Sequence, residues 1–154
     1  MKSKTEQNNA LLKSQEYFKM GVAKSNEKNY REALVNFNKA TNIVPKYAIP
    51  YYNGAFIKMK LKDYNAAILD FTDFIELNPL NVVYYFYINA YHNRGRAKQF
   101  LKDHEGAIAD YSKAIQLKSS FSMAYYNRGI CKIALEYNGG YQDIVKAKRL
   151  GYKK

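Results

Sequence analysis

The chain has 154 residues, 25 of them basic and 13 acidic, so its formal net charge is +12. Apolar residues make up 47% and charged residues 25%, values that exclude collagen-like, coiled-coil and wholly disordered chains. A single cysteine cannot form an internal disulfide, which excludes a disulfide-stapled secreted domain. No apolar run approaches the roughly 20 residues of a membrane span. With no signal-peptide pattern at the N-terminus, we expect a cytoplasmic protein.

Residues 1–13 are polar, and we expect a flexible segment that joins the first helix near Asn8–Leu12. Small residues then recur at Gly21, Ala55, Gly95 and Gly129, with spacings of 34, 40 and 34 residues. A tyrosine stands four residues before each, at Tyr17, Tyr51, Tyr91 and Tyr125. Alanine follows at +12 and an aromatic residue at +16 in the first three copies, and proline at +24 in the first two.

This pattern resembles the tetratricopeptide repeat, in which small, aromatic, alanine and proline positions recur every 34 residues or so. The copies correspond to residues 14–47, 48–81, 88–121 and 122–152. The resemblance implies an all-α solenoid of stacked antiparallel helix pairs, a right-handed superhelix, and one domain over residues 14–154. Turns between paired helices are expected at Lys28–Tyr30, Lys62–Tyr64 and Lys102–His104, and prolines 45 and 79 end second helices.

Two departures from the repeat are informative. Residues 82–87 are a six-residue insertion without a turn residue, which predicts an N-terminal extension of the third copy's first helix. The extension either packs on the preceding helix or forms an association patch of Val82, Val83, Tyr84 and Phe86. The fourth copy has Gly139-Gly140 where its second helix begins, and we expect this last pair to cap the stack.

The sequence predicts no enzyme, cofactor or metal site. His104 stands where other copies have tyrosine, which favours a packing role in a turn, and Cys131 is expected to be a small packing residue. No metal-ligand spacing is present. The carboxylates Asp70, Asp73, Glu76 and Asp110 lie on second helices, where we expect a solvated surface.

Function is therefore expected on the concave face formed by the first helices. We expect its lining to consist of the residues at −6, −3, +1, +4 and +5 from each small residue, together with the asparagines at −2. The candidates are Phe18, Val22, Ile49, Tyr52, Asn53, Phe56, Met59, Lys60, Asn89, His92, Asn93, Arg96, Tyr126 and Asn127. The same rule adds Gln15, Ser25, Asn26, Gln99, Phe100, Met123, Ile130, Ile133 and Ala134.

An apolar and aromatic lining with a few amides favours a protein-interaction module that binds a peptide or partner helix. Relatives that bind acidic chaperone tails use a set of lysine, arginine and asparagine residues on three successive first helices. Whether that set is aligned with copies one to three or with copies two to four, this sequence matches it at a single asparagine. Binding of a chaperone tail is therefore not expected. The alternatives are a binder of single-stranded RNA or another anionic polymer, from the charge and sixteen tyrosines, and a scaffold that self-associates through residues 82–87.

Overall fold

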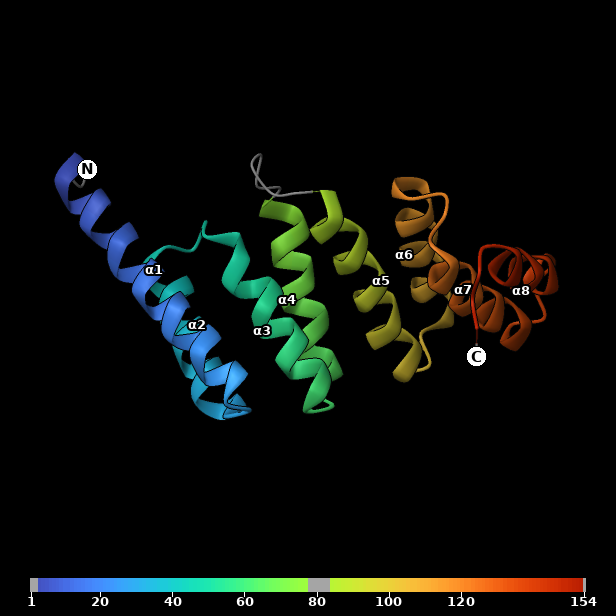
Figure 1. Ribbon diagram of the computed structural model, residues 1–154, viewed down its shortest axis with the longest axis horizontal. Helices are drawn as coiled ribbons and strands as arrows, with labels where there is room; N and C mark the ends of the chain where they lie inside the picture. Colours follow the sequence, from blue (N-terminus) through green and yellow to red (C-terminus); the bar gives the residue numbers. More distant parts are fainter. Residues whose placement is uncertain (1–2, 78–83, 154) are drawn as a thin grey trace. The chain divides into compact units, whose positions relative to one another are not determined.

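The computed structural model describes residues 3–77 and 84–153, which form helices and connecting turns with no strand among them. The chain divides into two compact units, residues 1–79 and 80–154, and each is described by itself. The first unit holds α1 (Lys4–Asn26), α2 (Tyr30–Ile43), α3 (Ala48–Lys60) and α4 (Tyr64–Leu77). The second holds α5 (Tyr84–Phe100), α6 (His104–Leu117), α7 (Ser122–Ala134) and α8 (Gly140–Arg149). Within each unit, consecutive helices pair as hairpins (Figure 1).

The expected all-α architecture is confirmed, while one continuous domain over residues 14–154 stays a prediction. Among the described helices, none is long and apolar enough to cross a membrane.

The first helix begins earlier than the sequence predicted. It starts at Lys4 rather than near Asn8, because Ser3 and Glu6 form a capping box. The Ser3 hydroxyl accepts a hydrogen bond from the Glu6 amide at 3.2 Å, and the Glu6 carboxylate accepts one from the Ser3 amide at 2.7 Å. These bonds satisfy amides that the first turn of a helix otherwise leaves unpaired.

The turns inside the first three helix pairs are confirmed and share one geometry. Lys28, Lys62 and Lys102 have φ values of 61°, 62° and 66°, so each ends a helix in the left-handed region. The next residue is asparagine or aspartate, whose side chain accepts a hydrogen bond from an amide of the following helix, at 2.9 Å for Asp103 and Gly106.

The insertion lengthens α5, which has 17 residues where α3 and α7 have 13. Tyr84–Tyr87 form its first turn, as expected for a helical extension, while Val82 and Val83 lie outside the described residues. Tyr84 is 58% exposed and Tyr85 62%, whereas Phe86 is half-buried. The association patch stays a prediction.

Small residues bring the paired helices together as predicted. A Cβ on Gly21 would collide with the ring of Phe37, and one on Gly95 would lie 3.0 Å from the ring of Tyr111. Both rings are almost fully buried, so the glycines make room for the largest side chains of the core.

Gly129 lies closest to a neighbouring backbone. A Cβ on it would lie 2.7 Å from the carbonyl oxygen of Gly140 and 2.9 Å from Ile144 Cγ1. Because a backbone carbonyl cannot move aside as a side chain can, we expect Gly129→Ala to lower the free energy of unfolding by about 1–3 kcal/mol, measured by urea denaturation. The matched control is Gly54→Ala, whose Cβ would meet only side-chain atoms of Asp70 and Leu34. Equal losses in the two variants would contradict the prediction.

The expectation that second-helix carboxylates are solvated is wrong for Asp70 and Asp110. Asp110 is 3% exposed and faces the first helix of its own pair, where a bidentate arginine and a lysine neutralise it. Ion pairs between the two helices of a hairpin occur at equivalent positions in three repeats. They join Asp70 to Lys58 at 2.6 Å, Asp110 to Arg94 at 2.7 Å and Lys98 at 2.9 Å, and Asp143 to Arg128 at 2.7 Å and Lys132 at 2.9 Å.

Candidate functional site

In the first unit, three of the predicted groove residues pack in or on the core. Phe18 and Val22 pack on the cluster around Phe37, and the ring of Tyr47 covers Phe18 at a centroid distance of 5.6 Å. Tyr52 is only 8% exposed. It is therefore a core residue, which corrects its prediction as a ligand contact, because aromatic rings of α4 enclose it (Phe74 at 5.2 Å).

The exposed residues of this face are fewer. Phe56 is 37% exposed, and Lys60 is exposed with its ammonium group 3.3 Å from the hydroxyl of Tyr30. Ile49 and Met59 are half-buried. The side-chain amide of Asn53 donates to the carbonyl of Ile49 in its own helix at 3.0 Å, which commits one of its two N–H donors within the helix. Phe56 and Lys60 are thus the accessible part of the predicted surface.

In the second unit, His92 and Asn93 are buried, at 4% and 6% exposure, which corrects their prediction as ligand contacts. The His92 ring lies between those of Tyr111 and Phe121, with centroids 5.6 and 4.8 Å away. Burial, together with the charge of Arg96, lowers the pKa of His92 to about 4.

Two further candidates have partners within the unit. The amide of Asn89 donates to the carbonyl of Tyr85 at 2.7 Å. The ring of Tyr126 stacks on that of Tyr152 at a centroid distance of 4.3 Å, so Tyr126 is half-buried at the edge of the unit.

Other candidates of the second unit line a hollow of about 570 Å³ between the ends of α5 and α7. We name it the α5–α7 hollow. Its lining consists of Arg96, Gln99, Phe100, Lys102, His104, Asn127, Ile130 and Ala134. Six of these satisfy the sequence rule for the concave face. Lys102 and His104 were interpreted as turn residues. The lysine that recurs at this turn in three copies was the sequence signal that could have placed Lys102 at the site.

Both apolar and cationic side chains line the hollow. Phe100 is 54% exposed and lies with Ile130 and Ala134, while Arg96 and Lys102 supply positive charge. No carboxylate is among the lining residues.

Polar partners hold several lining groups in place. Arg96 donates to Asn93 Oδ1 at 3.4 Å, and Gln99 accepts from the hydroxyl of Tyr111 at 2.7 Å. The side-chain amide of Asn127 lies 3.1 Å from His92 Nε2. Buried groups therefore fix the orientation of the polar side chains that line the hollow.

The described residues suggest no reactive group. They contain no cluster of three or more histidine, cysteine, aspartate or glutamate side chains that could hold a metal ion. Cys131 is fully buried against Ala107 and Tyr111, as its predicted packing role requires. Burial raises the pKa of its thiol to about 11, which keeps the thiol protonated and unreactive at neutral pH.

Comparison with known proteins agrees with this architecture. A family model described as tetratricopeptide repeat matches residues 48–79 and 88–121. The chain therefore contains tetratricopeptide repeats at these two segments. The matched segments are the second and third copies in the predicted register, and the first and fourth copies form the same helix pairs. No curated protein matches the sequence.

Solved structures share the fold at low sequence identity. A MamA structure (residues 41 to the end) from Desulfovibrio magneticus RS-1 is 20% identical, with a TM-score of 0.77 over 89% of this chain and 75% of that one. The Arabidopsis OM64 tetratricopeptide domain is 22% identical, with a TM-score of 0.70 over 81% and 98%. The first such domain of Spaghetti (RPAP3), bound to the HSP90 peptide SRMEEVD, is 24% identical, with a TM-score of 0.72 over 82% and 95%.

Proposed function

We propose that the chain is a non-catalytic protein-interaction module whose second unit binds a peptide segment of a partner protein. The observation that carries the proposal is the α5–α7 hollow, where an exposed phenylalanine lies beside two cations and an oriented asparagine amide. An apolar anchor surrounded by polar groups is the usual form of a peptide-binding site.

The charges of the hollow favour an acidic peptide. Arg96 and Lys102 line it without a carboxylate to neutralise them there, so a peptide carboxylate would gain charge-assisted hydrogen bonds. Phe100 and Ile130 favour an apolar side chain next to that carboxylate. The peptide bound by the Spaghetti domain combines such residues in its Glu-Glu-Val-Asp end, which supports the class of ligand but does not identify it.

The test is selection from a phage-displayed library of random peptides against the full chain. We expect the selected peptides to carry aspartate or glutamate beside an apolar residue. Their affinity should fall about tenfold or more in the double variant Arg96→Ser, Phe100→Ser, as loss of a central anchor and a charge predicts. Fluorescence anisotropy with the labelled peptides measures the change.

The matched control is Leu69→Ser with Lys46→Ser, which removes an exposed apolar residue and an exposed cation from the first unit. It should leave the affinity unchanged. Equal affinity for all variants, or selected peptides without acidic residues, would refute the α5–α7 hollow as the site. Tighter binding of a labelled single-stranded RNA than of any peptide at physiological salt would favour the nucleic-acid alternative instead.

A further inference from the structure

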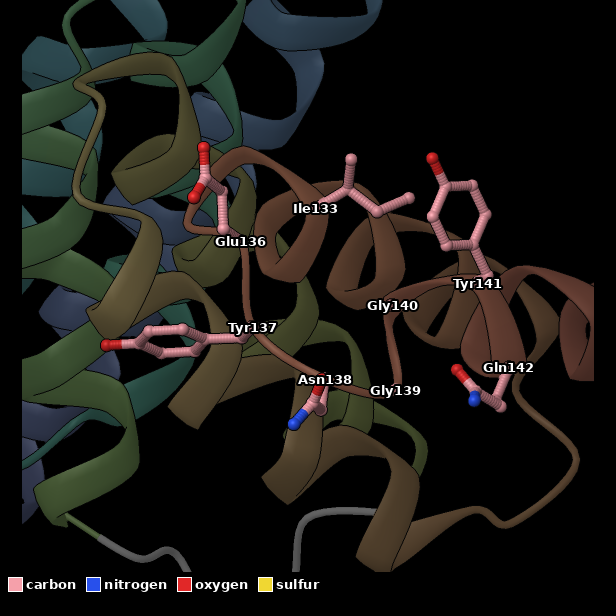
Figure 2. Close-up of a pocket in the computed structure, with 8 residues that line it drawn as sticks. All are labelled: Ile133, Glu136, Tyr137, Asn138, Gly139, Gly140, Tyr141 and Gln142. Carbon is pink, nitrogen blue, oxygen red and sulfur yellow. The ribbon is translucent and has the colours of Figure 1, made fainter.

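The outer face of α8 carries exposed apolar side chains in a row. Tyr141 is 73% exposed and Val145, one turn later, is 47% exposed. With Gln142, Lys146 and Arg149 they line a shallow hollow of about 530 Å³. A second hollow of about 380 Å³ at the α7–α8 turn shares Tyr141 and Gln142 with the first. Figure 2 shows Ile133 and Tyr141 projecting to the same side of that turn.

The ion pairs of Asp143 show which positions of α8 correspond to which positions of the other second helices. Asp143 pairs with two cations of α7 just as Asp110 pairs with two cations of α5. Tyr141 stands two residues before Asp143 and therefore corresponds to Ile108 of α6. Ile108 packs on a core cluster that includes Cys131 of α7. The position that Tyr141 occupies is thus one that the following first helix covers in α6.

Val145 supports the same correspondence. It stands two residues after Asp143 and corresponds to Ser112, whose hydroxyl accepts a hydrogen bond from Arg128 of α7 at 3.0 Å. In the first unit, Leu34 occupies the position of Tyr141 and packs on a cluster that includes Ile57 of α3. A first helix therefore covers this face on both α2 and α6. Within the described part of the chain, no interaction covers Tyr141 or Val145 on α8.

The charges around this face indicate what would cover it. Lys146, Lys148 and Arg149 are exposed on the last turns of α8. The one carboxylate of the helix, Asp143, is buried and already paired with cations of α7. Glu136 lies at the opposite end, in the turn before α8. A helix that covers the face would therefore gain from carboxylates near the C-terminal half of α8.

We propose that Ile133, Tyr141, Val145, Lys146 and Arg149, together named the α8 face, bind an amphipathic helix of a partner protein that carries carboxylates beside an apolar stripe. A second copy of this chain is a poorer occupant. The first helix it could offer is α1, in the segment of residues 1–47 that has 9 basic and 4 acidic residues. Like charges would then face one another across the interface.

The probe is a labelled synthetic peptide that copies residues 121–137, the helix that covers α6, with Arg128→Glu and Lys132→Glu. We expect it to bind the full chain in anisotropy titrations. Its affinity should fall about tenfold in Tyr141→Ser with Val145→Ser, and by a similar factor in Lys146→Glu with Arg149→Glu. Raised salt should weaken binding to the wild-type chain, because part of the attraction is between charges.

Two matched comparisons make the result specific. The unmodified peptide, which keeps Arg128 and Lys132, should bind more weakly than the acidic one. The variant Arg96→Ser with Phe100→Ser, in the α5–α7 hollow, should bind the acidic peptide as the wild type does. The result therefore separates binding at the α8 face from binding at the proposed peptide site. Because the substituted α8 residues are exposed, the variants should keep the wild-type helical circular dichroism.

Three outcomes would overturn the proposal. The first is equal binding of the acidic and unmodified peptides, and the second is absence of binding by the acidic peptide at millimolar concentration. The third is dimerisation of the full chain in light scattering that the Tyr141→Ser, Val145→Ser variant abolishes, which would make a second copy the occupant.

Discussion

Replacing Asp110 by alanine is expected to lower the free energy of unfolding of the second unit by about 3 kcal/mol. The carboxylate is 3% exposed and accepts a bidentate pair of hydrogen bonds from Arg94, at 2.7 and 2.9 Å, with Lys98 at 2.9 Å. Its removal leaves two cations between α5 and α6 without their counter-charge. The cost comes from those cations, which keep only part of their contact with water.

Urea denaturation followed by circular dichroism measures the loss, and hydrogen exchange of α5 and α6 amides locates it. The control is Glu76→Ala, which removes an exposed carboxylate from α4 and should change stability by no more than about 0.5 kcal/mol. The triple variant Arg94→Met, Lys98→Met, Asp110→Leu should recover most of the loss, since it replaces the whole ion pair by apolar groups. A loss in Asp110→Ala no larger than that of the control would show that the ion pair does not stabilise the unit.

The helices and their pairing could be predicted because they depend on local pattern. Small residues at 34-residue spacing mark where helices approach, and Gly21 and Gly129 indeed leave no room for a Cβ. The lysine-plus-asparagine or lysine-plus-aspartate turns are also local, since one residue takes positive φ and the next caps the following helix.

The ion pairs between paired helices were missed because a carboxylate on a second helix looks in sequence like a surface charge. Its burial depends on cations of the other helix that lie 11 to 16 residues earlier in the sequence. The signal was present as a lysine three residues after the small residue in every copy, at Lys24, Lys58, Lys98 and Lys132. The first copy has Asn36 at the carboxylate position, and there Lys24 pairs with Glu27 and Glu32 instead.

The sequence predicted which stripe of the first helices forms the candidate surface. It did not predict which residues of that stripe are buried and which are exposed. Residues at −3 lie on the predicted stripe, yet in the first and third copies an aromatic residue from the chain after the second helix covers them. Tyr47 covers Phe18, and Phe121 covers His92. In the third copy, positions +1 and +5 escape this cover, so Arg96 and Phe100 reach solvent. Only tertiary packing distinguishes the two sets, because periodicity assigns both to the same face.

The burial of His92 predicts that the stability of the second unit depends on pH. The amide of Asn127 donates to Nε2, so the folded ring is neutral, and protonation would place a charge between two aromatic rings. Burial and the charge of Arg96 lower its pKa from 6.5 to about 4 in the folded chain. The unfolded chain therefore binds one more proton between pH 6.5 and 4. The contribution of the neutral His92 ring to the free energy of unfolding is therefore complete above pH 6.5. It is lost as the pH drops through that window, by about 3 kcal/mol in all.

Urea denaturation at pH 7, 6, 5 and 4.5 should show this fall, and His92→Gln should reduce it. Glutamine keeps an acceptor for Asn127 but does not titrate, so the variant is expected to be less stable than wild type at pH 7 and to approach it as the pH is lowered. Asp143 acts in a lower range. Burial raises its pKa, but hydrogen bonds from Arg128 and Lys132 outweigh burial and hold the pKa below 3.8, so its contribution is lost only at more acidic pH. Parallel stability curves for wild type and variant between pH 6.5 and 4.5 would contradict a neutral, buried His92.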